Sequence, residues 1–201
     1  MSDNLVLTLE DYQAAADNLG VDVPAVIAVA RIESSGAPFI KEGYPTILFE
    51  GHIFWKELKK RGIDPYHVLD ERPEANDILF PKWVRKYKDG MAEYTRLDRA
   101  CAINEDAALC SASWGAFQIM GFNHTACAFE TVQGFVAAQK RSAGDQLLSF
   151  CEFMRQNKLV RLLRAHDWAG FALRYNGAGY KKNAYDTKLA AEYRKAVQNY
   201  G

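Results

Sequence analysis

Apolar residues recur at helical spacing along most of the chain, and glycine, proline or asparagine interrupts the pattern at intervals. This spacing predicts helices over residues 9–19, 25–32, 52–61, 94–110, 131–138, 143–156, 157–165, 167–175 and 186–198. Residues 37–50 instead hold two short β-like runs around a Lys-Glu-Gly-Tyr-Pro turn, which predicts a hairpin. Residues 63–90 contain three prolines and are expected to be rich in loops. The predicted fold class is α+β and mainly α-helical, with a small β-hairpin lobe next to a buried central helix.

The predicted helix over residues 25–32 is apolar on nearly every side, and such a helix is buried. Glu33 ends it, and Gly36 and Pro38 prevent its continuation. A carboxylate at the end of a buried helix can lie in a dry pocket, where burial raises its pKa and suits it to act as a general acid. A lone glutamate near a helix end is more often a capping or solvated residue, so this stretch alone does not establish catalysis.

A second carboxylate, Glu50, ends the apolar run over residues 47–49. Two carboxylates on either side of the scissile bond are the usual machinery of glycoside hydrolysis, so Glu33 and Glu50 are the candidate catalytic pair. Glu93 and Asp98 are ranked lower, because the charge pattern around them is typical of an exposed mixed-charge helix face. Four arginines are candidates for supporting these carboxylates or binding an acidic substrate, although surface solvation is their usual role: Arg31, Arg96, Arg99 and Arg174.

Three stretches place glycine beside aromatic and amide side chains: Trp-Gly-Ala-Phe-Gln at 114–118, Gly-Phe-Asn-His at 121–124 and Tyr-Asn-Gly-Ala-Gly-Tyr at 175–180. Aromatic faces pack on sugar rings, and carboxamides both donate to and accept from hydroxyl and acetamido groups. Each stretch taken singly is more often turn chemistry. Taken together they predict a sugar-binding groove, with Gln118, Asn123, Tyr175 and Asn176 as the candidate substrate-binding residues.

Composition narrows the function classes. The 201 residues carry 25 basic and 25 acidic side chains, so charge gives no reason to expect nucleic acid as a partner. No apolar window is long enough for stable membrane insertion, and the N-terminal residues do not resemble a secretory signal. The four cysteines and four histidines lack metal-ligand spacing, so we expect reduced thiols, no metal and no cofactor.

Several of these stretches also resemble the N-acetylmuramidase family of phage endolysins, within the lysozyme-like superfamily. The matching segments are Arg-Ile-Glu-Ser-Ser-Gly at 31–36, Ile-Leu-Phe-Glu-Gly-His-Ile-Phe at 47–54, residues 93–100, residues 107–123, Asp-Trp-Ala-Gly-Phe-Ala at 167–172, and residues 175–190. They occur in the expected order over nearly the whole chain.

The resemblance implies a lysozyme-like fold and hydrolysis of the β-1,4 bond between N-acetylmuramic acid and N-acetylglucosamine in bacterial peptidoglycan. The catalytic glutamate of the family corresponds to Glu33. Ser35 replaces a usual glycine, and little effect on the chemistry is expected from it. Ala116 replaces a common leucine and Ala178 a common proline, and these two differences are expected to alter the packing of the groove. We expect one catalytic domain over residues 1–201 without a separate wall-binding module.

Two other functions fit the same residues. A lytic transglycosylase uses one acid/base glutamate and releases 1,6-anhydro products, and a non-catalytic lysozyme-like protein would only bind the wall. For a phage enzyme, we expect a monomer that accumulates in the host cytoplasm and depends on a holin to reach the wall in the periplasm. An injected antibacterial effector is the alternative route.

Overall fold

The protein is described from a computed structural model that covers residues 3–34 and 36–200. Its α-helices are α1 (Leu9–Leu19), α2 (Val23–Glu33), α3 (Gly51–Lys60), α4 (Pro65–Glu71), α5 (Met91–Cys101), α6 (Glu105–Cys110), α7 (Val132–Arg141), α8 (Ala143–Gln156), α9 (Val160–Arg164), α10 (Trp168–Asn176) and α11 (Tyr185–Tyr200). The strands are β1 (Phe39–Lys41), β2 (Tyr44–Pro45), β3 (Ile47–Phe49), β4 (Ala112–Trp114) and β5 (Ile119–Met120). Short 3-10 helices are η1 (Asp3–Leu5), η2 (Pro73–Asp77), η3 (Gly121–Cys127) and η4 (Gly177–Asn183).

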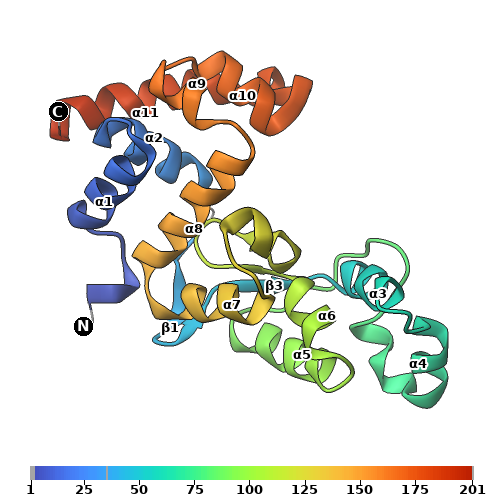
Figure 1. Cartoon of the computed structure of the whole chain (residues 1–201). Helices are drawn as coiled ribbons and strands as arrows, with labels where there is room; N and C mark the ends of the chain where they lie inside the picture. Colours follow the sequence, from blue (N-terminus) through green and yellow to red (C-terminus); the bar gives the residue numbers. More distant parts are fainter. Residues whose placement is uncertain (1–2, 35, 201) are drawn as a thin grey trace.

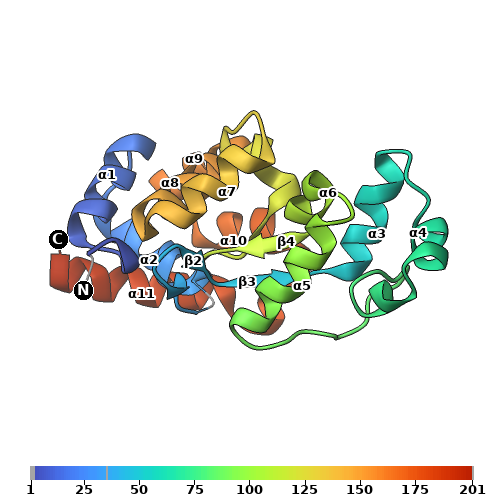
Figure 2. The same cartoon turned by 90° about the horizontal axis from the view of Figure 1, so that it is seen from below.

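The helices form two groups joined by α7, α8 and the sheet. Helices α1, α2 and α9–α11 gather at one end of the molecule, where both termini lie, and α3–α6 gather at the other (Figure 1). The chain segment between α4 and α5 runs along the outside of the second group (Figure 2). This mainly helical arrangement confirms the predicted fold class.

Helix α2 is buried as its sequence predicts. Every residue from Pro24 to Ala30 is buried, and the helix packs between α1 and the long α11. Helix α1 begins with a capping box, in which Asp11 N–H donates to Thr8 Oγ1 and the Asp11 carboxylate accepts from the Thr8 backbone. Glu33 therefore stands at the end of a rigid, desolvated helix.

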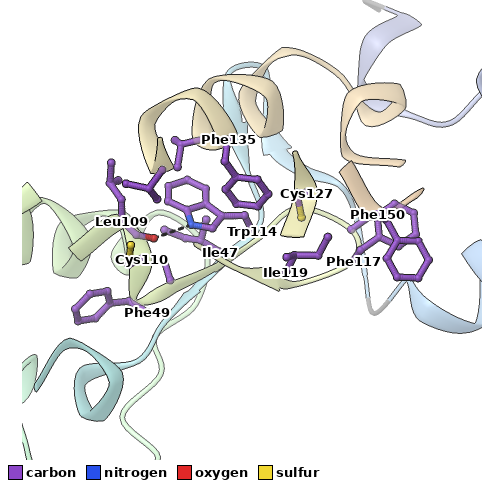
Figure 3. Close-up of a cluster of buried hydrophobic side chains, with 14 of the residues drawn as sticks. Ile47, Phe49, Leu109, Cys110, Trp114, Phe117, Ile119, Cys127, Phe135 and Phe150 are labelled. Atoms are coloured by element: carbon purple, nitrogen blue, oxygen red, sulfur yellow. Dashed lines mark hydrogen bonds between the residues drawn. The ribbon is translucent and has the colours of Figure 1, made fainter. Parts of the chain in front are cut away.

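The predicted hairpin over residues 37–50 is wrong in its pairing. β1 pairs with β2 in a two-stranded sheet, whereas β3 forms an antiparallel three-stranded sheet with β4 and β5. The physical reason is burial: Ile47 and Phe49 on β3 face the core around Trp114 of β4 (Figure 3). The Trp114 indole N–H donates to the backbone oxygen of Leu109 at 3.2 Å, so the largest core side chain is also satisfied in hydrogen bonding.

Two other element predictions need correction. Residues 63–90 are not only loop, because Pro65 and Pro73 begin α4 and η2 at first-turn positions where proline is tolerated. The single helix predicted over residues 94–110 is two helices, because Asn104 caps the second through a 2.9 Å bond from Ala107 N–H.

Within the described residues the four cysteines are free, and three of them are buried: Cys110, Cys127 and Cys151. None of the helices within residues 3–34 and 36–200 has both the length and the apolarity needed to cross a bilayer.

Candidate active site

Glu33 lies at the last position of α2 and is held by the C-terminal part of the chain. The hydroxyl of Tyr185, in the first turn of α11, donates to Glu33 Oε1. Burial raises the pKa of Glu33, and hydrogen bonds from the Tyr185 and Tyr175 side chains lower it by less. The net direction is upward, which is what a carboxyl group needs in order to hold a proton for donation.

Aromatic rings form the wall beside Glu33. The Tyr175 ring stacks on Tyr185 with the centroids 6.2 Å apart, and on Phe171 of the same helix at 5.8 Å. Burial raises the pKa of both tyrosines, and the neighbouring Glu33 carboxylate adds to the effect. Both hydroxyls therefore stay protonated and remain hydrogen-bond donors. Asn176 is exposed and its amide reaches the Tyr185 hydroxyl.

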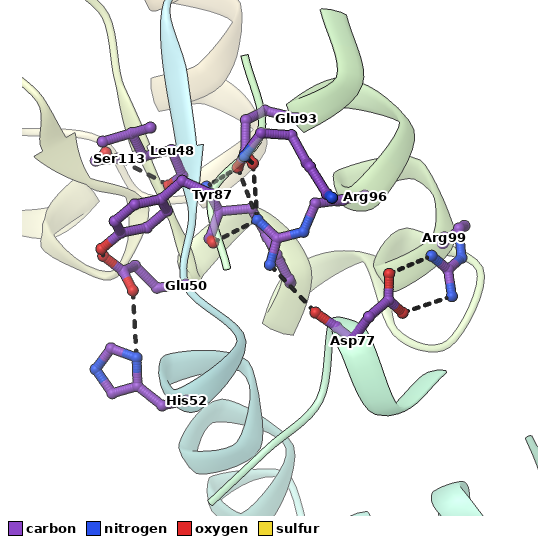
Figure 4. Close-up of polar contacts among 11 residues, drawn as sticks. Leu48, Glu50, His52, Asp77, Tyr87, Glu93, Arg96, Arg99 and Ser113 are labelled. Atoms are coloured by element: carbon purple, nitrogen blue, oxygen red, sulfur yellow. Dashed lines mark hydrogen bonds and ion pairs between the residues drawn. The ribbon is translucent and has the colours of Figure 1, made fainter. Parts of the chain in front are cut away.

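Glu50 lies at the end of β3, where it precedes α3, and it has partners of its own. The Tyr87 hydroxyl donates to Glu50 Oε1 at 2.5 Å, and His52 Nδ1 lies 3.2 Å from Glu50 Oε2 (Figure 4). The His52 contact lacks hydrogen-bond alignment, so it is an electrostatic contact whenever His52 is protonated. The Glu50 carboxylate keeps 17% of its side-chain surface exposed, which leaves it accessible to a ligand or water.

Glu93 supports the strand that carries Glu50, and its predicted place on an exposed helix face is wrong. Its side chain is 1% exposed and accepts from Phe49 N–H at 2.7 Å, from Lys88 N–H at 2.6 Å and from Arg96 Nη1 at 2.8 Å (Figure 4). Arg96 also donates to the Phe49 carbonyl at 3.1 Å. The buried pair thus clamps both backbone groups of the residue before Glu50, whereas Asp98 is exposed.

Gln118 lies in the turn between β4 and β5 and is already bonded to the protein. Its amide nitrogen donates to the Gly115 carbonyl at 2.7 Å and to the Thr46 carbonyl at 3.3 Å. Its oxygen accepts from the Ser113 hydroxyl at 2.7 Å. Buried Gln146 holds the same turn from the other side, since its Oε1 accepts from Ala116 N–H at 2.8 Å.

The predicted residues therefore fall into separate groups. Glu33, Tyr175 and Asn176 meet around Tyr185, while Glu50 sits with Tyr87 and His52. Asn123 is half-buried in η3, and Ser35 lies outside the described residues. Among the arginines, Arg96 and Arg99 bind acidic partners within the α3–α6 half, Arg31 pairs with Glu192 at 3.7 Å, and Arg174 binds the Asn157 carbonyl.

Two site tyrosines were missed as functional residues. Tyr185 lies in a segment that resembles the family, and its signal was its place after the glycine-rich turn at 175–180. Tyr87 lies in an irregular segment without periodicity, so nothing in the sequence joined it to Glu50.

A half-buried glutamate of raised pKa, set among tyrosines and amides in a mainly helical fold, is the kind of site that glycoside hydrolases use for general acid catalysis. The sequence model of the N-acetylmuramidase family matches residues 22–197, and the chain belongs to this family. No curated protein matches significantly. The crystal structure of the Burkholderia AP3 phage endolysin is similar, with a TM-score of 0.86, 39% identity and coverage of 98% of this chain and 74% of that one. The protein is thus a muramidase-type glycoside hydrolase whose substrate class is peptidoglycan.

Proposed function

We propose that the protein hydrolyses the β-1,4 bond between N-acetylmuramic acid and N-acetylglucosamine, with Glu33 as the general acid. The observation that carries this proposal is the Glu33 environment: a carboxyl group at the end of a buried helix, with a raised pKa and two tyrosine donors. Protonated Glu33 donates its proton to the glycosidic oxygen as the bond to the anomeric carbon breaks and the sugar develops oxocarbenium character.

The two tyrosines stabilise the state of Glu33 that follows the same proton transfer. Glu33 becomes an anion when it releases its proton, and a buried anion is unfavourable without donors. The Tyr185 and Tyr175 side chains are hydrogen-bonded to this carboxyl group, so they stabilise the anion that forms. Burial favours the protonated form of Glu33 before the proton is donated. The tyrosine hydroxyls reduce the free-energy cost of the buried anion afterwards.

Glu50 is the proposed second carboxylate. Its Tyr87 and His52 contacts orient it, and its partial exposure allows it to accept a proton from an attacking water or to stabilise positive charge on the sugar. The Glu93–Arg96 pair fixes the strand end from which Glu50 projects.

Asn123, Asn176, Tyr175 and Gln118 are the proposed sugar-binding residues. Asn176 is exposed beside Tyr185, and the half-buried Tyr175 ring lies next to it in the aromatic wall. The Gln118 amide nitrogen already donates to two backbone carbonyls, which fixes the shape of the turn. Its side-chain oxygen keeps a second lone pair that can accept a hydrogen bond from the sugar.

The similar phage endolysin suggests the setting. We infer that this chain acts as an endolysin: a monomeric catalytic domain that collects in the host cytoplasm, passes the inner membrane with the help of a holin and attacks the wall. Size-exclusion chromatography with light scattering tests the monomer, and co-expression with and without a holin tests the access route.

The test of the reaction is digestion of purified peptidoglycan, followed by mass spectrometry of the released fragments. Wild-type protein is expected to give hydrated reducing ends at N-acetylmuramic acid. Release of 1,6-anhydro ends would instead identify a lytic transglycosylase, and binding without cleavage a wall-binding protein. Glu33→Gln, shown to be folded by circular dichroism, is expected to be inactive, and near wild-type activity in this variant would refute the assignment of Glu33.

A further inference from the structure

Residues 81–90, which we call the basic segment, connect η2 to α5 without regular secondary structure (Figure 2). Their sequence, PKWVRKYKDG, has four basic residues and one acidic residue, although the whole chain has 25 of each. A local excess of positive charge attracts anionic ligands. This excess is therefore a property of one surface segment and is invisible in the net charge.

The basic segment is anchored beside Glu50 by two side chains and one backbone group. The Tyr87 hydroxyl donates to Glu50 Oε1 at 2.5 Å, and Lys88 N–H donates to buried Glu93 at 2.6 Å. The Lys86 ammonium donates to the Asn76 carbonyl at 3.1 Å. These contacts place an irregular segment at a defined position, which is what a binding surface requires.

The other side chains of the basic segment point into solvent. Trp83 is 60% exposed, and its side chain is close to the Tyr87 side chain. Since the Tyr87 hydroxyl donates to Glu50, Tyr87 links Trp83 to this carboxylate. Lys82 and Arg85 are exposed, and within residues 3–34 and 36–200 no ion pair or hydrogen bond engages their side chains. An exposed tryptophan flanked by two available cations fits a ligand that carries both apolar surface and carboxylates.

We propose that Lys82 and Arg85 bind the carboxylates of the peptidoglycan stem peptide, with Trp83 packing against the adjoining peptide or sugar. This inference rests on the proposed function, since it places the glycan strand in the site that contains Glu50. Stem peptides branch from the muramic acid residues of the strand and carry free carboxylates, which arginine binds in a bidentate manner and lysine as a point charge. A muramic acid that carries a stem peptide and binds near Glu50 would therefore bring anionic groups to the basic segment.

An anionic membrane surface is the competing ligand, because cations and tryptophan also suit lipid headgroups. The structure favours the stem peptide. The basic segment is tied to a candidate catalytic carboxylate rather than to a separate face of the molecule. It also lacks regular secondary structure, whereas membrane surfaces are typically bound by an amphipathic helix with an apolar stripe.

The experiment compares two substrates: intact sacculi, and glycan strands from which an amidase has removed the stem peptides. The Lys82→Ala/Arg85→Ala variant is expected to lower the ratio of kcat/KM on intact sacculi to kcat/KM on stripped strands by roughly 10-fold, mainly through KM. The same ratio is also expected to be lower for wild-type protein in about 0.5 M NaCl than at low salt, because salt screens exposed charges. Lys59→Ala/Arg161→Ala removes the same charge from exposed positions outside the basic segment and is expected to leave the ratio unchanged.

The outcomes are distinguishable. Wild-type protein that cleaves neither substrate refutes the proposed function itself. Wild-type activity on both, with an unchanged ratio in the Lys82→Ala/Arg85→Ala variant, refutes the stem-peptide site alone. Sedimentation with phosphatidylglycerol–phosphatidylethanolamine vesicles that depends on Lys82 and Arg85, together with an unchanged ratio, assigns the basic segment to a membrane surface and overturns the proposal.

Discussion

The hydroxyl of Tyr185 offers a direct test of how Glu33 works. Tyr185→Phe removes the donor to Glu33 Oε1 and keeps the ring that stacks on Tyr175 at 6.2 Å. The wall of the site is thereby retained, and the main change is one hydrogen bond to the carboxyl group. The Tyr175 side chain remains as a second donor, so the variant weakens the stabilisation of the Glu33 anion without abolishing it.

The expected magnitude follows from the charge that develops on Glu33. A hydrogen bond to an ionised group contributes about 1.5–3 kcal/mol, and less while the acceptor is neutral. Since Glu33 becomes anionic as it protonates the leaving oxygen, most of that energy appears in the transition state. Its loss corresponds to a fall in kcat of roughly 10- to 150-fold.

The pH dependence has a defined sign. Activity requires protonated Glu33, so it is lost as the pH rises through the pKa of this group. The Tyr185 hydrogen bond lowers that pKa, against the larger opposing effect of burial. Tyr185→Phe is therefore expected to shift the alkaline limb of the pH profile to higher pH while the maximum falls.

Initial rates of fragment release from dye-labelled peptidoglycan, measured across the pH range, give both quantities. Tyr66→Phe is the matched control, because Tyr66 is 64% exposed on α4 and contacts neither carboxylate in the structure. A normal maximal rate in Tyr185→Phe, or an alkaline limb displaced to lower pH, would refute the assigned role of the hydroxyl.

Three further predictions concern stability and reactivity. The pKa of Glu33 is raised from 4.5, so the folded state holds this proton more tightly than the unfolded chain, and stability falls as pH rises between the two values. Glu33→Gln is thus expected to raise Tm at neutral pH, and calorimetry should show the gain vanishing below about pH 4.5. Arg96→Met leaves a carboxylate buried without its cation and should cost about 3–5 kcal/mol in urea unfolding, whereas Arg99→Met, at an exposed pair, should cost under about 1 kcal/mol; equal costs would contradict the burial argument. Burial raises the pKa of Cys127 and Cys151 to about 12, so mass spectrometry should find neither alkylated by iodoacetamide near neutral pH until the protein is denatured.

The elements that sequence periodicity predicted well are those stabilised locally. Helices α1, α8 and α10 carry capping residues and complete apolar faces within their own residues. Strand β3 has only three residues and pairs with β4, and one of the contacts between them, Ser113 Oγ to the Leu48 carbonyl, spans 65 positions. Short strands hold too little local information to specify a distant partner, so the predicted hairpin was given the wrong pairing.

The candidate site shows the same division. The apolar run of α2 and its terminal carboxylate are properties of adjacent residues, so the sequence by itself determined that Glu33 ends a buried helix. Its donor Tyr185 is 152 positions away, and only the tertiary structure decided that this hydroxyl meets Glu33. The charge pattern around Glu93 predicted a surface residue, yet packing buries it against Arg96 and the backbone of β3. Periodicity reports the faces of an element, whereas the identity of the groups that share a desolvated space depends on how distant elements pack.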